Sequence, residues 1–299
     1  QLFGDIPIFV HLESADVWAH QHLFDLDEQG QPITVTGVPP DYFSAEGQLW
    51  GNPQYHWQRM QGTAFEWWLR RFDSAARQFD IVRIDHFRAL QAYWEIPAGA
   101  ISAREGRWVE APGRELLHAV RRRYPELKLV AENLGLITAD VEALRAEFAL
   151  PGMVVLQFAF DGSPDNPYLN HMHKRGDIVY TGTHDNNTTL GWFESLDAAT
   201  RERVYAYFGH PDESMPWMLI HQAMASRADT AIIPWQDFLG LDGRSRMNTP
   251  GTTVGNWRWR FAWQQVPQGL AARIRQLLAA HRRQLADPSE ATLPTQLKA

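Results

Sequence analysis

The chain of 299 residues contains no cysteine, so disulfides and thiolate metal sites are excluded. This absence is compatible with a reducing compartment, and we expect a cytoplasmic protein. Long apolar runs are also missing, since the stretch 149–160 is already interrupted by Gln157, and we expect no membrane partner. The first residues lack the basic region and the processing site of a signal peptide.

Positive charge is also scarce. The sequence has 28 Lys and Arg against 35 Asp and Glu, a net charge of -7, which argues against nucleic acid as a partner. It contains no glycine-rich phosphate loop, no HExxH motif and no dedicated calcium loop. We therefore expect neither an organic cofactor nor a bound metal.

Aromatic residues, in contrast, are abundant, with 13 Trp in the chain. Most are expected in the core, but several lie beside Gly, Asn and Pro, as Trp50 and Trp257 do. A pyranose ring presents C–H groups on one face and hydroxyls at its edge, so a flat aromatic ring with a polar rim suits a sugar. Composition alone makes carbohydrate binding only a suggestion.

Short apolar, β-branched runs alternate with amphipathic segments along the chain. The expected strands are 5–10, 81–84, 128–131, 153–159, 178–181 and 231–234. The expected helices are 63–78, 112–124, 138–148, 198–208, 217–227 and 269–285, the third with a polar cap at Thr138. This alternation predicts an α/β fold with a mostly parallel sheet covered on both faces.

Six strands fit two architectures. A closed (β/α)8 TIM barrel needs eight strands, so it requires that the first strands are missing from this chain. The alternative is an open six-stranded sheet. We expect the barrel, with 1–299 as one catalytic domain that is incomplete at its N-terminus. The segment 25–57 is too long for a plain barrel connection and is expected to be an inserted loop region over the active site.

Three expected strands are followed by a carboxylate: Asp85, Glu132 and Asp185. Because the active site of a parallel α/β barrel is built from the C-terminal ends of its strands, these side chains should converge. Arg83 lies two residues before Asp85, so the two point to the same side of a strand, where the cation favours an ionised acid.

Each of these residues alone has an ordinary explanation. A single Asp after a strand more often caps a helix or forms a turn, and His86 or His184 alone would more often make ordinary polar contacts. Three acids at one topological position, two with an adjoining His, favour a catalytic cluster. Such a cluster can cleave a glycosidic bond with a nucleophile, a general acid/base and a stabilising third acid. Metal-dependent hydrolysis is the competing use of clustered acids and histidines.

Around these residues the sequence closely resembles the amylomaltases, the 4-α-glucanotransferases of glycoside hydrolase family 77 in the α-amylase superfamily. The matching motifs, in chain order, are 4–10 (GDIPIFV), 14–18 (SADVW), 37–44 (GVPPDYFS), 47–53 (GQLWGNP), 82–88 (VRIDHFR), 131–135 (AENLG), 183–186 (THDN), 246–251 (RMNTPG) and 255–259 (GNWRW). Several long motifs in one order make the resemblance specific. It implies a TIM barrel of the α-amylase type.

The resemblance also implies roles for individual residues. Asp85 would be the nucleophile of a covalent β-glucosyl-enzyme intermediate, Glu132 the general acid/base, and Asp185 the group that binds donor hydroxyls and stabilises the transition state. The implied contacts to the sugar in the reactive subsite are Arg83, His86 and His184. Further implied substrate contacts are Tyr42, Phe43, Gln48 and Trp50 in a mobile loop, together with Asp161 and Asn248.

The implied activity is transfer of α-1,4-glucan segments between maltooligosaccharides, or glucans derived from starch or glycogen. The sequence departs from the family at Glu13 and Asn133, where the family usually has an aspartate. An α-1,4-glucan hydrolase of the same superfamily and an inactive glucan-binding fragment remain as alternatives. A barrel without its first strands would expose edges and core, so we expect the chain to need an N-terminal segment for activity.

Overall fold

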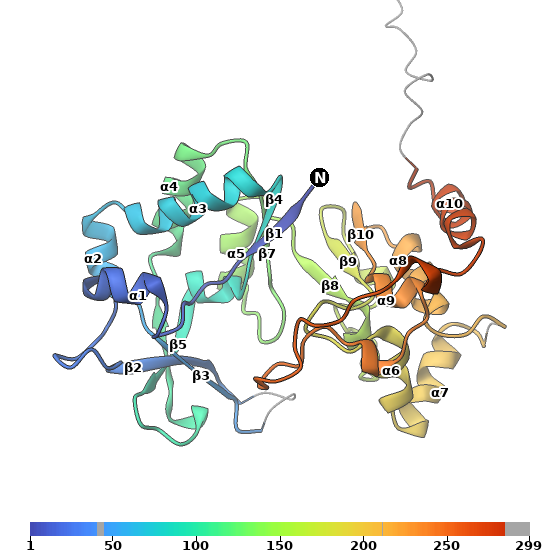
Figure 1. The fold of residues 1–299 in the computed structure, drawn as a ribbon, viewed down its shortest axis with the longest axis horizontal. Helices are drawn as coiled ribbons and strands as arrows, with labels where there is room; N and C mark the ends of the chain where they lie inside the picture. The colour runs from blue at the N-terminus through green and yellow to red at the C-terminus, as the bar shows by residue number, and fades with distance from the viewer. Residues whose placement is uncertain (41–44, 211, 285–299) are drawn as a thin grey trace, which may run out of the picture. The chain divides into compact units, whose positions relative to one another are not determined.

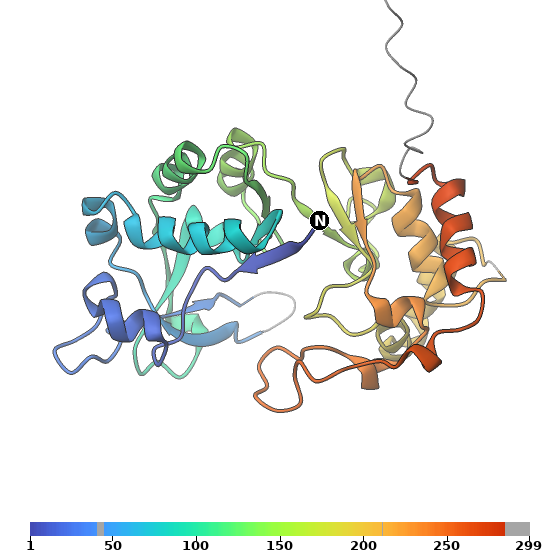
Figure 2. The same cartoon turned by 45° about the horizontal axis from the view of Figure 1, so that its top comes forward.

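A computed structural model of the protein describes residues 1–40, 45–210 and 212–284. The chain forms two compact units, Gln1–Met153 and Val154–Ala299. Each unit has its own hydrophobic core and its own parallel strands, and each is described by itself below (Figures 1 and 2).

The first unit is built around a three-stranded parallel sheet in the order β1-β4-β7. Its strands are β1 (Phe3–Ile6), β4 (Ile81–Ile84) and β7 (Lys128–Ala131). The unit's helices are α1 (Ala15–His20), α2 (Trp57–Gly62), α3 (Glu66–Gln78), α4 (Gly113–Arg123) and α5 (Ala139–Glu147). Helix α3 packs against β1, β4 and α4 (Figure 1). These contacts bury the apolar strand residues and leave the polar strand ends at one edge.

A second sheet in the first unit is antiparallel, with the strand order β3-β2-β5-β6. Its strands are β2 (Thr34–Val38), β3 (Gln48–Pro53), β5 (Ala92–Pro97) and β6 (Arg107–Glu110). The segment 25–57 therefore contributes two paired strands. The sequence did not predict them, because glycine and proline interrupt the alternation and the pairing shifts register between Val35 and Gly37. A side chain at Gly37 would lie 2.2 Å from the backbone oxygen of Gln48, so only glycine fits this approach.

The second unit contains a three-stranded sheet in the order β10-β9-β8, with β9 and β10 parallel. Its strands are β8 (Met153–Val155), which begins at the last residue of the first unit, β9 (Ile178–Tyr180) and β10 (Thr230–Ile232). The helices are α6 (Thr189–Ser195), α7 (Ala198–Tyr207), α8 (Trp217–Ala225), α9 (Trp235–Phe238) and α10 (Leu270–Ala280). Helices α8 and α10 lie side by side and share a small apolar cluster (Figure 2).

The predicted α/β fold is confirmed, and all six expected strands and all six expected helices form near their expected positions. The first strand ends at Ile6, directly before Pro7, which lacks the N–H that a strand ladder needs. The fourth ends at Val155, where a short 3-10 turn begins. Thr138 occupies the cap position of α5, but its side chain accepts no capping hydrogen bond. Within the described residues, β1, β4 and β7 form one three-stranded sheet and β8, β9 and β10 form another, and neither sheet is closed.

Four of the 13 tryptophans are buried, Trp57, Trp67, Trp68 and Trp217, so the expectation that most of them lie in the core is wrong. Tyr55 is at the centre of one aromatic cluster with Trp57, Trp67 and Trp68. Others are exposed, including Trp18 and Trp257. No helix in the described part of the chain is long and apolar enough to cross a membrane.

Candidate active site

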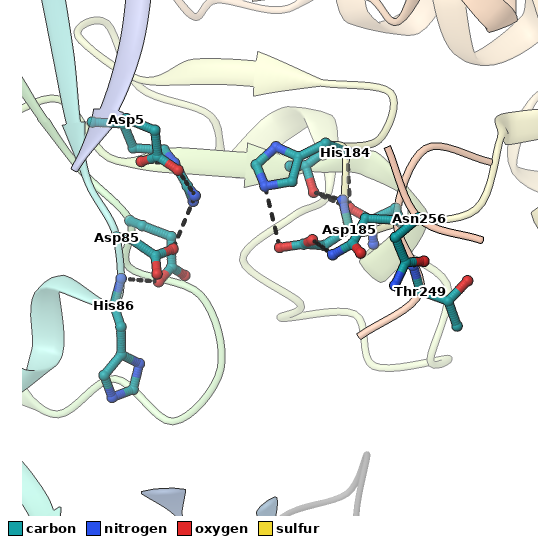
Figure 3. Close-up of polar contacts among 12 residues, drawn as sticks. Asp5, Asp85, His86, His184, Asp185, Thr249 and Asn256 are labelled. Atoms are coloured by element: carbon teal, nitrogen blue, oxygen red, sulfur yellow. Dashed lines mark hydrogen bonds and ion pairs between the residues drawn. The ribbon is translucent and has the colours of Figure 1, made fainter. Parts of the chain in front are cut away.

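The C-terminal end of β4 holds an arginine between two aspartates. The guanidinium group of Arg83 donates to Asp5 at 3.0 and 2.8 Å and to Asp85 at 2.9 Å. Figure 3 shows the side chains of Asp5 and Asp85 close to one another. Burial opposes the charge on Arg83, but the bond to Asp5 and the charge of Asp85 outweigh it and raise the pKa of Arg83. The expected Arg83–Asp85 pair is thus confirmed.

Asp5 was missed by the sequence analysis. Arg83 and Asp5 are direct partners in the register of β4 and β1, so their side chains leave the sheet together. The signal for this contact is the strand register, which a single sequence does not contain. The motif GDIPIFV, quoted for the resemblance, is the only hint that this position matters.

Glu132 follows β7 directly and lies beside the end of β4. Its Oε2 accepts the backbone N–H of His86 at 2.7 Å, and its Oε1 accepts that of Leu134 at 2.8 Å. Burial, reinforced by the charge of Asp85, raises the pKa of Glu132 to about 7, although Arg83 and the two N–H groups oppose this change. The group can therefore donate or accept a proton near neutral pH, as a general acid/base must.

His86 links Glu132 to the aromatic side of the site. Its backbone is left-handed, with φ 45°, which is unusual for a residue with a side chain, and this turn directs its N–H at Glu132. Burial lowers the pKa of its ring to about 4, with a further contribution from Arg88, so the ring is neutral. Its Nε2 atom is buried and has no hydrogen-bond partner among the described residues. A substrate hydroxyl could supply that partner.

Trp50 covers the ring of His86. The two rings meet edge to face with their centroids 4.8 Å apart, and Trp50 is 37% exposed. Its indole N–H donates to the side chain of Gln48 at 3.1 Å, which fixes the ring on β3. Tyr42 and Phe43, which the sequence analysis assigned to the same loop, lie outside the described residues.

The third carboxylate, Asp185, belongs to the second unit, in the loop between β9 and α6. Its Oδ1 accepts from the side-chain amide of Asn248 at 2.6 Å, and the ring of His184 lies 3.4 Å from its Oδ2. Figure 3 shows the ring of His184 and the carboxylate of Asp185 facing one another. The structure thus brings together three residues that the sequence analysis had named independently.

Arg246 supports this group and was not predicted. Its guanidinium group donates to the backbone oxygen of Asp185 at 2.6 Å and to that of Asn248 at 2.7 Å. The indole of Trp257 lies beside the ring of His184, with 5.2 Å between the centroids. Both residues lie in motifs quoted for the resemblance, RMNTPG and GNWRW, so that resemblance could have flagged them.

Two further residues that the sequence analysis named, Asp161 and Asn133, make contacts of a different kind. Asp161 is exposed, and its side chain accepts the N–H of Ser163 at 2.9 Å in a local turn, so its sugar contact stays a prediction. Asn133 donates to the carboxylate of Glu142 at 2.9 Å and accepts the N–H of Met153 at 2.8 Å. An aspartate here would face Glu142 without a donor, so the amide suits this environment.

Over the described ranges, no group of three or more His, Asp or Glu side chains could hold a metal ion.

Known proteins similar to this chain agree on one family. The sequence profile of the family described as 4-alpha-glucanotransferase matches residues 1–266. A 4-alpha-glucanotransferase of Thermus thermophilus is 48% identical over 292 residues, which cover 95% of this chain and 58% of the relative. One from Synechocystis is 48% identical over 277 residues, covering 91% of this chain and 55% of the relative. The chain thus spans somewhat over half the length of these curated relatives.

Solved structures extend the comparison to the fold. An amylomaltase from Streptococcus agalactiae in complex with acarbose superposes with a TM-score of 0.90 at 36% identity, covering 95% of this chain and 58% of that one. An amylomaltase from Corynebacterium glutamicum, 19% identical, has a TM-score of 0.67, covering 94% of this chain and 45% of that one, and shows the fold alone. With the family profile matched over most of its length, the chain belongs to the 4-alpha-glucanotransferase family, glycoside hydrolase family 77.

Proposed function

We propose that the complete protein containing this chain is a 4-α-glucanotransferase that moves α-1,4-glucan segments between maltooligosaccharides. The observation that carries the proposal is the pair of acids at the ends of β4 and β7. Asp85 is held by Arg83, while Glu132 has its pKa raised to about 7. A nucleophile and a proton donor next to one another are what a retaining glycosidic reaction requires.

In the first step, a carboxylate oxygen of Asp85 attacks the anomeric carbon of the donor sugar. Glu132 gives its proton to the glycosidic oxygen, the bond between that oxygen and the anomeric carbon breaks, and the shortened glucan leaves with a free 4-hydroxyl. The product is a β-glycosyl ester on Asp85. We propose that Asp185 stabilises the oxocarbenium-like transition state of this step, with Asn248 and His184 orienting its carboxylate.

In the second step, the 4-hydroxyl of an acceptor glucan attacks the same carbon from the opposite side. Glu132, now ionised, removes the proton of that hydroxyl, and the ester bond breaks to free the carboxylate of Asp85. Two inversions at one carbon retain the α configuration. Such a mechanism requires the two carboxyl groups to lie about 5–5.5 Å apart.

Transfer needs the acceptor sugar to compete with water for the intermediate. Trp50 provides a partly exposed indole directly over His86. Stacking of an acceptor on this ring would order the sugar and exclude water from the ester, which favours transfer over hydrolysis.

We further propose that the six strands of the two three-stranded sheets belong to a (β/α)8 barrel of the α-amylase type. Two observations support this architecture: the regular alternation of strands and helices, and the TM-score of 0.90 to an amylomaltase of which the chain covers 58%. The remaining strands would come from a segment upstream of residue 1, on which activity would depend.

The test is incubation of the complete protein with maltotriose, followed by oligosaccharide profiling and a reducing-end assay. We expect longer and shorter products at a constant number of reducing ends, and no products from an Asp85→Asn variant that folds normally. A rise in reducing ends without longer products would identify a hydrolase. Binding of maltotriose with no change in its length distribution would refute catalysis.

A further inference from the structure

Among the described residues, Asp237 is the most deeply buried acid outside the groups already discussed. It lies in the short helix α9 and is 1% exposed. Its Oδ1 accepts the backbone N–H of Thr189 at 2.8 Å, and its Oδ2 accepts the hydroxyls of Thr189 at 2.7 Å and Thr181 at 2.6 Å. Three donors thus satisfy one buried carboxylate.

The two threonines are the two ends of the loop that carries Asp185. Thr181 follows the last residue of β9, and Thr189 is the first residue of α6. Asp237 therefore ties the beginning and the end of the segment 181–189 to one point, with Asp185 near its middle. The carboxylate closes this loop in the way that a cross-link would.

The same helix also holds the second segment that reaches Asp185. Gln236, which is buried, donates from its side-chain amide to the backbone oxygen of Ser245 at 3.2 Å. The next residue is Arg246, whose guanidinium group donates to the backbone oxygen of Asp185. Helix α9 thus braces both the loop of Asp185 and the segment that contacts it.

Ordinary helix capping does not explain Asp237. Helix α6 already has its own cap, because the hydroxyl of Thr188 accepts the N–H of Gly191 at 3.1 Å. Burial also raises the pKa of Asp237, which means that the folded protein bears a cost for its charge. A buried charge is weak evidence for stability, since apolar residues of similar volume often stabilise a core as well. The three hydrogen bonds that Asp237 accepts say more about its role, because they fix the positions of Thr181 and Thr189 at the two ends of the loop.

From these contacts we infer that Asp237 is a positioning residue, which holds the loop 181–189 so that the carboxylate of Asp185 is presented in one orientation. This inference rests on the proposed function only in giving Asp185 a role in the reaction. The bracing itself is a property of the fold, and it can be tested without turnover.

The first experiment measures hydrogen exchange of the backbone amides of 183–187 in the complete protein. In Asp237→Asn one of the two acceptor oxygens becomes an NH2 group, so the side chain can no longer accept from Thr181, the hydroxyl of Thr189 and the N–H of Thr189 together, and the charge that strengthens these bonds is lost. We therefore expect the loop amides to exchange about tenfold faster or more. The matched control is Asp197→Asn, because Asp197 accepts the N–H and the hydroxyl of Thr200 at 2.9 and 2.8 Å at the start of α7. In the control, the exchange rates of the amides of 183–187 should match those of the wild type. Unchanged exchange in Asp237→Asn would overturn the inference.

The second experiment compares kinetics with maltotriose. Loss of a transition-state contact lowers kcat more than it changes KM, so we expect kcat of Asp237→Asn to fall about tenfold or more while KM changes less than about threefold. On an Asp185→Asn background the same substitution should lower kcat less than about twofold, because both act through one carboxylate. Full additivity of the two effects, or a kcat within about twofold of the wild type in the single variant, would overturn the inference.

Two further outcomes separate this inference from the proposed function. If Asp237→Asn does not fold, Thr181→Val removes one of the three bonds without placing an amide in the core, and it should show the same changes at smaller size. If the wild-type protein transfers no glucan but the amides of 183–187 exchange faster in Asp237→Asn, the positioning role stands and the proposed activity fails.

Discussion

Replacing Glu132 by Gln should change the stability of the protein in a pH-dependent way. The pKa of Glu132 is raised from 4.5 to about 7, first by burial and then by the charge of Asp85. Below pH 4.5 the side chain is protonated in both the folded and the unfolded state. Above pH 7 it is ionised in both, and the folded state bears the full cost of the buried charge, about 3 kcal/mol at about 1.4 kcal/mol per pH unit.

Glutamine removes this cost because it has no charge at any pH. Both oxygens of Glu132 accept backbone N–H groups, from His86 and Leu134. The variant therefore turns one NH2 group toward a donor and loses about 1–3 kcal/mol, by the same amount at every pH. Between pH 5 and pH 8.5 the wild type should therefore lose about 2–3 kcal/mol of stability relative to the variant, and the constant loss in the variant does not affect this change.

The assay is urea unfolding followed by tryptophan fluorescence at pH 5, 6, 7 and 8.5, with the free energy of unfolding extrapolated to water. Glu126→Gln, at an exposed glutamate between α4 and β7, controls for loss of one carboxylate. If the difference between wild type and Glu132→Gln stays constant within about 0.5 kcal/mol over this range, the pKa of Glu132 is ordinary and its assignment as the proton donor loses its physical basis.

Three further predictions concern turnover. The value of kcat/KM should fall above pH 7, because Glu132 must be protonated in the free enzyme. A decrease in kcat/KM that already begins near pH 5 as the pH rises would contradict this prediction. Arg83→Met removes the cation that holds Asp85, and kcat should drop about a hundredfold, with about 2 kcal/mol lost from the free energy of unfolding in urea. Trp50→Ala should raise the ratio of hydrolysis to transfer severalfold, measured as reducing ends per longer product, whereas Trp18→Ala, at an exposed tryptophan of α1, should not.

The three acids could be predicted because their signal is local. Each follows a short apolar run, and the run is what forms the strand and places the acid at its end. The partners Asp5, Arg246 and Asp237 could not be predicted in the same way. Asp5 contacts Arg83 across 78 positions of the chain, and Arg246 contacts Asp185 across 61. Asp237 contacts Thr189 across 48 positions and Thr181 across 56. These contacts depend on strand register and loop packing, which a single sequence does not contain.

The antiparallel sheet was missed for a different reason. Its strands β2 and β3 contain glycine and proline, residues that favour turns, and β3 is exposed over most of its length. Strand β3 pairs with β2, and β2 pairs with β5, which lies in a different part of the sequence. Propensity read along the chain therefore indicated a loop, whereas hydrogen bonding between distant segments produced a sheet.

The pKa values of Glu132 and Asp237 are shifted in the same direction, yet the surroundings of the two acids suit different tasks. Burial raises the pKa of both Glu132 and Asp237. Asp237 has three donors, two of them hydroxyls, and all of its bonds favour the charged form. Glu132 has two backbone donors and in addition the negative charge of Asp85 beside it, which favours the protonated form. A nearby like charge is what separates a group that can exchange a proton from one that only accepts hydrogen bonds.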